Sequence, residues 1–317
     1  MRLSVVTTLY RSAPHLEQFY TRAALAAGRV TADYEIVLVN DGSPDDSLAV
    51  ALELQQRDPR IRILDLSRNF GHHVALWTGL RHANGDLIFM LDSDLEEDPG
   101  WLVEFHEVGG RTGADVVYGV QRRRKGSLFE RVTGWLFYDV CAKPLGVPIP
   151  RNAVTARLMT RRYVDAVLQY EERESSILAL CTAAGFDQRA VPVTKGSRGA
   201  STYSVRRRIS TLVNAVTSFS NRPLVLIFYL GSIIMLASLG AAGLLIWERL
   251  MGRVGVPGYA SLLVSVWFLG GLAIFCVGVV GIYVSRVFIE VKRRPLAIVR
   301  AEYPPRTGAR AAGRLIH

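Results

Sequence analysis

Two long apolar runs toward the end of the chain limit its fold more than any other sequence feature. They extend from Leu224 to Trp247 and from Tyr259 to Ser285, and the first carries no charged residue. Each is long enough to cross roughly 30 Å of hydrocarbon, whereas core helices of soluble proteins seldom exceed about 20 residues without a charge. We therefore expect two transmembrane helices, with buried core helices as the alternative.

The basic residues are placed around these runs. The net charge of +10 fits binding to nucleic acid, to anionic lipid or to an anionic substrate. The position of the charges along the chain decides between these three partners. The flanking basic residues are Arg206, Arg207, Arg208 and Arg222 before the first run, and Arg286, Lys292, Arg293, Arg294 and Arg300 after the second. The loop between the runs carries only Arg249 and Arg253, beside Glu248. The positive-inside rule then predicts cytoplasmic termini, an inner-membrane bilayer as partner, and no nucleic acid.

The N-terminus and the cysteines agree with that location. The chain begins MRLSVVTTLY, which is typical of a strand and lacks the apolar stretch and cleavage site of a secretory signal. Cys141, Cys181 and Cys276 are far apart and form no ligand pairs, so we expect neither disulfides nor zinc.

From Leu3 to about Tyr118, short β-branched runs alternate with amphipathic stretches. The expected strands are Leu3 to Thr8, Glu35 to Val39, Ile61 to Asp65, Leu87 to Leu91 and Val116 to Tyr118, and the expected helices are Pro14 to Ala27, Ser43 to Arg57, Gly71 to Ala83 and Pro99 to Val108. This alternation predicts an α/β fold, with a mostly parallel sheet covered by helices on both faces. Ligands of such sheets bind beyond the carboxyl ends of the strands.

A pair of carboxylates follows the fourth expected strand. Asp92, Ser93 and Asp94 come directly after the apolar run LIFML. Hard oxygen ligands held at a strand end suit Mg²⁺ or Mn²⁺, and such an ion would neutralise a leaving diphosphate. The same pattern also fits a capped strand turn that needs no metal.

Neighbouring residues extend this candidate site. Glu96 is placed to add a further oxygen ligand, whereas Glu97 and Asp98 are assigned to the start of the next helix. Adjacent His72 and His73 suggest a second metal, but neighbours on a helix point about 100° apart. We therefore favour a helix-start or donor-pocket role for them.

A second polar group, Asn40 to Ser43, follows the second expected strand. Asp41 is suited to accept hydrogen bonds from a base or ribose, Gly42 permits close backbone approach, and Ser43 can cap the next helix. Alone, this segment reads as an ordinary turn. It is a candidate binding site because it is expected at the same sheet edge as the paired aspartates.

Two basic segments come between the α/β region and the apolar runs. Gln121 to Arg131 has more arginine than an ordinary solvated helix face, although a solvated charge run is the alternative. Lys195 to Tyr203, sequence KGSRGASTY, leads into Ser204 to Asn221, where apolar residues recur at helical spacing. We expect this last segment to be an interfacial helix on the anionic leaflet.

Five motifs together resemble a known family. SVVTTLY, VNDGSPDDS, LSRNFGHHVALWTG, DSDLEEDP and ARLMTRR occur in this order before the two apolar runs. They resemble the polyprenyl-phosphate glycosyltransferases of glycosyltransferase family two, which include dolichol-phosphate mannose synthase and bacterial polyprenyl-phosphate glucosyltransferases. The resemblance covers roughly Arg2 to Arg294 and implies a GT-A fold with a D-x-D motif.

The resemblance also implies roles for individual residues. It assigns nucleotide binding to Thr8, Leu9, Tyr10, Asp41, Asp92 and Ser93, metal binding to Asp92, Asp94 and Glu96, catalysis to Asp92, Asp94 and Arg157, and binding of the acceptor phosphate to Arg122, Arg124, Arg131, Lys195 and Arg198.

The chain departs from the family pattern at three places. Arg11 and Ser12 follow Tyr10 where relatives usually have Asn-Glu, and Thr155 replaces an aspartate proposed as catalytic base. The KGSRGASTY loop also lacks a lysine and a tryptophan common near its end. A phosphate monoester, with a second pKa of about 6, is largely dianionic at neutral pH and needs no base. We therefore expect the reaction type to survive these changes, with direct displacement inverting the anomeric carbon.

These observations predict a four-part chain. The parts are a GT-A domain at 1–193, a basic loop and interfacial helix at 194–221, two transmembrane helices within 222–286 (about 224–247 and 259–285), and a basic cytoplasmic tail at 287–317. The expected activity is transfer of one sugar from a UDP- or GDP-linked donor to polyprenyl phosphate, with a homo-tetramer as a plausible assembly. The alternatives are a processive polysaccharide synthase and a non-catalytic membrane scaffold.

Overall fold

The computed structural model describes residues 1–121, 152–170, 177–196, 222–251 and 258–305, and the chain divides into two compact units. The sheet unit comprises Met1–Tyr138, Pro148–Ser204 and Arg294–His317, and the helical unit comprises Asp139–Val147 and Val205–Arg293. The interfacial helix predicted at 204–221 lies outside the described residues.

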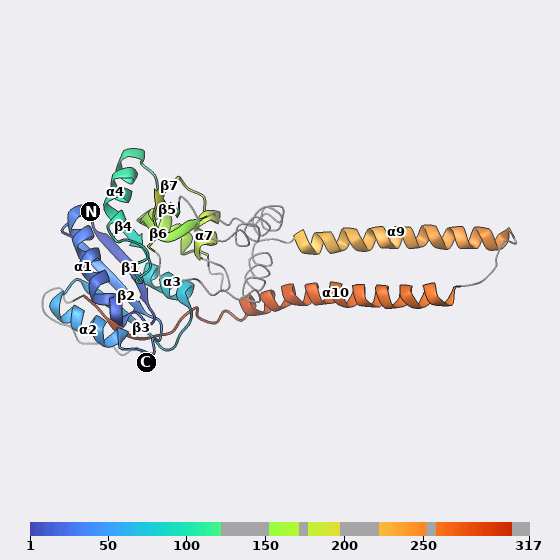
Figure 1. Cartoon of the computed structure of the whole chain (residues 1–317), viewed down its shortest axis with the longest axis horizontal. Helices are drawn as coiled ribbons and strands as arrows, with labels where there is room; N and C mark the ends of the chain where they lie inside the picture. The colour runs from blue at the N-terminus through green and yellow to red at the C-terminus, as the bar shows by residue number, and fades with distance from the viewer. Residues whose placement is uncertain (122–151, 171–176, 197–221, 252–257, 306–317) are drawn as a thin grey trace. The chain divides into compact units, whose positions relative to one another are not determined.

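The sheet unit is built on one mixed, mostly parallel sheet with the order β7-β5-β6-β4-β1-β2-β3-β8 (Figure 1). Its strands are β1 (Leu3–Leu9), β2 (Tyr34–Asn40), β3 (Ile61–Leu66), β4 (Leu87–Met90), β5 (Val116–Gln121), β6 (Ala153–Thr160), β7 (Gln188–Val193) and β8 (Val299–Tyr303). Pairing is parallel along β4-β1-β2-β3 and between β5 and β7. It is antiparallel where β6 joins β4 to β5 and where β8 joins β3.

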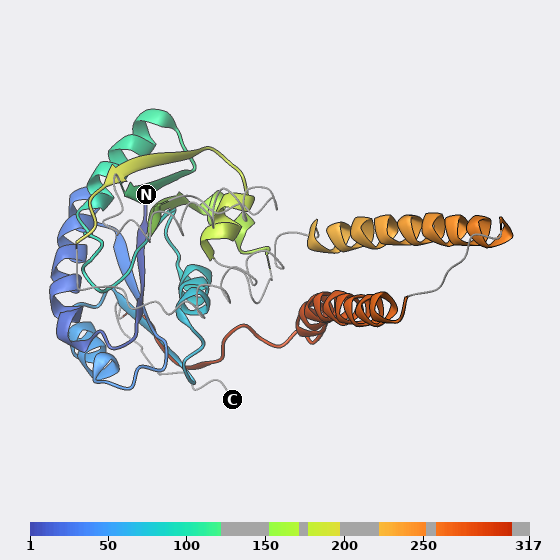
Figure 2. The same cartoon turned by 45° about the vertical axis from the view of Figure 1, so that its right-hand side comes forward.

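Helices cover both faces of this sheet, as the alternating pattern predicts. They are α1 (Ala13–Val30), α2 (Ser47–Arg57), α3 (His72–His82), α4 (Trp101–Thr112), α6 (Arg161–Val167) and α7 (Ile177–Ala183). Helices α1, α2 and α4 lie on one face and α3 on the other (Figures 1 and 2). Gly79 lets α3 approach closely, because a Cβ there would lie 2.5 Å from Val6 Cγ1 and 3.0 Å from Val39 Cγ2.

The expected strands and the first four helices form near their predicted bounds. The second helix begins at Ser47 rather than Ser43, because Asp45 accepts hydrogen bonds from the Ser43 hydroxyl and from both the backbone and hydroxyl of Ser47. Residues 43–46 therefore form a polar turn ahead of the helix. The α/β fold with a mostly parallel sheet is confirmed.

Strand β8 was not anticipated. The sequence pattern predicts a tail at 287–317, whereas Val299–Tyr303 pairs antiparallel with β3 and extends the sheet by one edge strand. Arg62 and Glu302 form an ion pair across this junction. The Gln55 side chain donates to the backbone oxygens of Tyr303 and Pro304.

The helical unit contains α9 (Arg222–Leu250) and α10 (Tyr259–Val291), which contact each other. Among the described residues, one segment, Phe268–Val291 in α10, is long and apolar enough to cross a membrane, and its side chains are not buried in a protein core. In α9, where the structure describes only part of the side chains, the described apolar segment is Leu224–Ile234. Both predicted helices form, but the two-helix transmembrane hairpin is not established.

Candidate active site

The carboxyl ends of β4, β1 and β2 lie side by side, which brings the two predicted polar groups to one edge of the sheet. Ser93 joins these strand ends. Its buried hydroxyl donates to the Thr8 backbone oxygen at 2.8 Å and lies 3.0 Å from the Ser12 hydroxyl. Ser93 therefore fixes the turn between the two aspartates against β1, with its hydroxyl engaged within the protein.

Asp92 has one satisfied and one unsatisfied carboxylate oxygen. Oδ2 accepts a hydrogen bond from the Thr155 hydroxyl at 3.1 Å. Oδ1 is buried and has no hydrogen bond, although His72 Nε2 lies 3.1 Å away as an ion-pair partner. A buried oxygen without a hydrogen bond is costly unless another ligand reaches it. This oxygen is the feature of the site that best fits a cation.

His72 is the first residue of α3, and its ring contacts Thr8 in β1 and Asp92 after β4. Its Nδ1 lies 3.1 Å from the Thr8 hydroxyl, on the side opposite to Asp92. Burial alone lowers the pKa of His72, but the adjacent Asp92 carboxylate outweighs it and the net pKa is raised. Burial likewise raises the pKa of Asp92, and His72 and Lys195 reverse that effect, so its pKa lies below the ordinary value.

Asp94 is the more accessible of the two aspartates. One of its oxygens accepts a hydrogen bond from the Glu96 backbone N–H at 3.0 Å. Burial, together with the nearby negative charges of Asp92 and Glu96, holds the pKa of Asp94 above its ordinary value. Cation binding would relieve this repulsion.

The role of Glu97 differs from the one that the sequence predicts. The sequence assigns it to the start of the next helix, but α4 begins at Trp101 and the Glu97 side chain is fully buried. Its carboxylate accepts from the backbone N–H groups of Thr155, at 2.9 Å, and Asp92, at 3.4 Å. Burial, with the charge of Asp92, raises the pKa of Glu97 to about 7. Glu97 thus joins β6 to the aspartate turn, and no sequence periodicity indicated it.

Lys195 follows β7 and its side chain enters the acidic group. Its Nζ lies 3.4 Å from Glu96 Oε2 and 3.5 Å from Glu97 Oε1, and Gly196 N–H donates to the Glu96 backbone oxygen at 2.8 Å. Glu96, predicted as a metal ligand, is therefore paired with a lysine. No three His, Cys, Asp or Glu side chains in the described parts of the chain are placed to hold a metal ion together.

Asp41 fixes the loop that precedes α3. Its buried carboxylate accepts from the backbone N–H groups of Phe70, at 2.7 Å, and Gly71, at 3.0 Å. Burial outweighs these hydrogen bonds, so the pKa of Asp41 is raised. Gly42 has φ +56°, and a Cβ there would lie 2.4 Å from the Arg68 carbonyl carbon, so only glycine fits.

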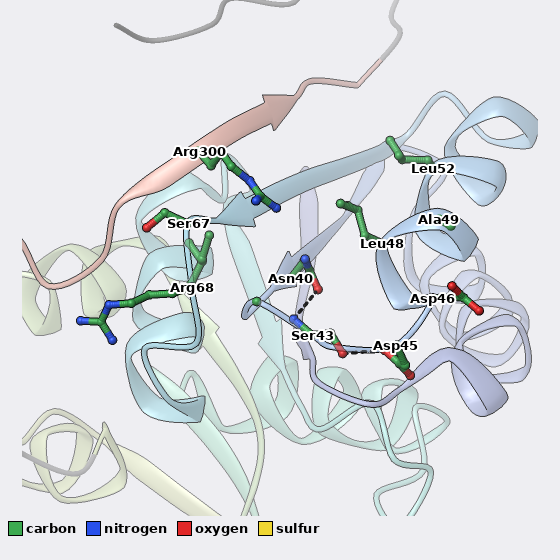
Figure 3. A pocket seen from close by; sticks show the side chains of 12 residues that line it. Asn40, Ser43, Asp45, Asp46, Leu48, Ala49, Leu52, Ser67, Arg68 and Arg300 are labelled. Atoms are coloured by element: carbon green, nitrogen blue, oxygen red, sulfur yellow. Dashed lines mark hydrogen bonds between the residues drawn. The ribbon is translucent and has the colours of Figure 1, made fainter.

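A cavity of about 490 Å³ adjoins this loop on the side of α2 and β8 (Figure 3). Its lining includes Asn40, Gly42 and Ser43 from the loop, Leu48 and Leu52 from α2, Ser67 and Arg68 after β3, and Arg300 from β8. None of the acidic residues from 92 to 97 lines it. The cavity is therefore a neighbour of the aspartate turn and not its ligand pocket.

The other predicted site residues lie in different surroundings. Arg157 is buried in β6 and its Nε donates to the Thr155 backbone oxygen at 3.3 Å. Thr8 and Leu9 are buried at the end of β1, whereas the Tyr10 side chain is exposed. Arg122, Arg124, Arg131 and Arg198, predicted to bind the acceptor phosphate, lie outside the described residues.

Comparison with known proteins supplies the family. The family model described as "Glycosyl transferase family 2" matches residues 4–168. A protein of Mycobacterium tuberculosis named "Putative glycosyltransferases" is 51% identical over 96% of this chain and 89% of its own length. The "SfII prophage-derived bactoprenol glucosyl transferase" of Shigella flexneri is 31% identical over 96% of this chain and 99% of its own.

Among solved structures, similarity is weaker. A mannosyltransferase from Pyrobaculum calidifontis, in complex with GDP-Man and Mn²⁺, aligns over 92% of this chain and 87% of its own with 17% identity and a TM-score of 0.49. The sequence matches extend over the sheet unit and its aspartate turn. The chain therefore belongs to glycosyl transferase family 2, with a GT-A-like α/β fold, and is a glycosyltransferase.

Proposed function

We propose that this glycosyltransferase moves a single sugar from a UDP- or GDP-linked donor to a polyprenyl phosphate at the cytoplasmic face of the inner membrane. The observation that carries the proposal is the aspartate turn after β4, where a buried oxygen of Asp92 has no hydrogen bond. The apolar segment Phe268–Val291 supports a membrane location for the reaction. The name of the Shigella relative, a bactoprenol glucosyl transferase, supports a lipid acceptor.

The residues at the turn fit a divalent cation. Asp92 offers an oxygen that lacks a hydrogen bond and is ion-paired with His72, and Asp94 offers a carboxylate that is less deeply enclosed. Mg²⁺ and Mn²⁺ favour such oxygen ligands and leave positions for phosphate. Asp92 and Asp94 would hold the ion, which supplies charge neutralisation for the diphosphate of the donor. Glu96 is left as a further ligand, which requires its ion pair with Lys195 to open.

Thr155 stands where relatives usually have an aspartate, and it contacts the aspartate turn. Its hydroxyl donates to Asp92 Oδ2, and its backbone N–H donates to Glu97, so this position orients the metal-binding carboxylate. A dianionic phosphate acceptor needs no general base. It attacks the anomeric carbon as the bond to the nucleoside diphosphate breaks, and this direct displacement inverts the configuration. Electrostatic preorganisation and proximity then provide the catalysis.

Acceptor binding is proposed for the basic residues predicted from the sequence. Arg122, Arg124, Arg131 and Arg198 are suited to phosphate because guanidinium groups bind its oxygens in pairs. Lys195 is already beside the aspartate turn, paired with Glu96 and Glu97. We propose that it exchanges these partners for phosphate during turnover. The homo-tetramer stays a prediction.

An assay with the purified full-length protein, a panel of nucleotide-sugars and a short polyprenyl phosphate tests the proposal. We expect a lipid-linked monosaccharide with inverted anomeric configuration, formed only when Mg²⁺ or Mn²⁺ is present. A polymer would favour a processive synthase, and absence of turnover with every donor would favour a non-catalytic scaffold. Equal rates after chelation would contradict the metal site.

A further inference from the structure

A chain of polar contacts, buried at Asp65 and Asn40, connects β8 to the loop at Asn40–Ser43. Strand β8 follows α10 along the sequence, through residues 292–298, and pairs with the edge strand β3. The loop follows β2 on the other side of β3. Asp65 near the end of β3 is opposite Asn40 in one pairing and Ala301 in the other. It is therefore in contact range of both neighbours.

The two oxygens of Asp65 are divided between these neighbours. Oδ2 accepts a hydrogen bond from Arg300 Nε at 2.8 Å and is ion-paired with Arg300 Nη2 at 2.7 Å. Oδ1 accepts from Asn40 Nδ2 at 2.8 Å. Asn40 in turn accepts from the Ser43 backbone N–H, at 3.3 Å, through its own side-chain oxygen. Asp65 and Asn40 are almost fully buried. Figure 3 shows the Arg300 side chain extending from β8 toward the side of the cavity where Asn40 lies.

Arg300 supplies the only cation that contacts Asp65 among the residues the structure describes. A buried carboxylate that loses its cation carries an uncompensated charge, which favours rotation of the carboxylate toward water. That rotation removes the fixed acceptor for Asn40 Nδ2. Asn40 also orients Ser43, so the loop that carries Asp41 and Gly42 loses a support on each side of these residues.

We propose that Arg300 is a positioning residue for the nucleotide-sugar donor. Through Asp65 and Asn40, it holds the loop at Asn40–Ser43 in the conformation that binds the donor. The strand that returns from the membrane helix thereby completes a site built by the N-terminal part of the chain. The inference rests on the proposed role of this loop in donor binding.

The test compares Arg300→Ala with Glu302→Ala in the full-length protein. Glu302 is a matched control, because it pairs with Arg62 across the same β3-β8 junction and makes no contact with Asn40 or Asp65 among the contacts that the described residues show. We expect Arg300→Ala to raise the KM for the donor at least about fivefold, the lower end of typical coupling between sites, with kcat little changed. Glu302→Ala should leave this KM within about twofold, although both variants weaken the docking of β8.

The thermal midpoint of each variant separates loss of positioning from loss of folding. Equal KM effects in the two variants, or an effect of Arg300→Ala that follows the thermal midpoint alone, would overturn the inference. The double variant Asp65→Asn with Arg300→Ala should raise KM no more than the larger single change, because the two residues act through one contact. Additive effects would also count against it.

Asp41→Ala distinguishes failure of this inference from failure of the proposed function. If Asp41→Ala raises the donor KM and Arg300→Ala does not, the loop binds donor and the connection through Asp65 is wrong. If neither variant changes the KM, the loop is not a donor site, and the proposed role of Asp41 is wrong as well.

Discussion

Asp65 and Asp92 are both carboxylates held at the same edge of the sheet, but their surroundings differ. Both oxygens of Asp65 are hydrogen-bonded, one to Arg300 and one to Asn40. Asp92 has one oxygen hydrogen-bonded to Thr155, whereas the other is buried without a hydrogen bond. A fully satisfied carboxylate stabilises structure, and an unsatisfied one is prepared for a ligand. We therefore assign Asp65 to the support of the donor loop and Asp92 to cation binding.

The largest effect is expected from removing a cation ligand. Asp94→Ala should lower kcat by about 10²-fold or more, as loss of a group that stabilises developing charge commonly does. It should also abolish the rise in thermal midpoint that Mn²⁺ and a nucleoside diphosphate produce together, because only the folded site binds them. A thermal-shift titration checks this. Asp98→Asn, an exposed position in the same acidic run, serves as the control and should keep both properties.

The rigidity of the donor loop is tested by two glycine substitutions. Gly42→Ala should lower the free energy of unfolding by about 3 kcal/mol, since a positive φ and a clash with the Arg68 backbone act together. Gly113→Ala shares the positive φ but has no atom within 4 Å of the added Cβ, so we expect about 1 kcal/mol. Urea denaturation followed by intrinsic fluorescence measures both. Equal losses would mean that the loop relaxes away from Arg68.

The structural role of Asp65 predicts a metal-independent change. Asp65→Asn places an amide against Arg300 and should cost about 2 kcal/mol of stability, less than for a fully buried pair because Arg300 is partly exposed. The loss should be the same with and without Mn²⁺. If the variant instead loses its response to Mn²⁺, Asp65 contributes to cation binding as Asp92 does, and its assignment to loop support is wrong.

The last prediction is the pH dependence contributed by Glu97. Its pKa is raised to about 7 in the folded protein from 4.5, so the folded state binds the extra proton between these values. Stability from this group is present below pH 4.5 and is lost as the pH rises to about 7. In metal-free protein, Glu97→Gln should remove that decline, as thermal midpoints across this range would show. An identical decline in the variant would mean that another group titrates.

Local patterns were enough to predict much of the sheet unit. Period-two apolar runs and helix-start signals gave β1 to β4 and the intervening helices, because each depends on neighbours along the chain. The order β4-β1-β2 then brings Asp92 and Asp41 to one edge, as the rule for parallel sheets predicts. The residues proposed to touch the ligand were for this reason accessible from sequence.

The failures concern contacts between distant segments. Glu97 was assigned to a helix start because nothing in its neighbours reveals that the Thr155 N–H would approach its carboxylate. Strand β8 was read as tail because VRAEY is short and charged, and it is a strand only where β3 offers an open edge. In both cases a buried carboxylate has a partner that is far away in sequence: Thr155 for Glu97, and Arg300 in β8 for Asp65.

By itself, the sequence determined the α/β alternation, the apolar helices and the acidic turn after the fourth strand, since periodicity and turn chemistry are local properties. Only the tertiary structure decided which carboxylates are satisfied. The partners of Asp92 and Asp65 are His72, Thr155 and Arg300, which other elements bring into place. Hydrogen bonding in a buried site is set by three-dimensional packing, and a linear pattern does not encode it residue by residue.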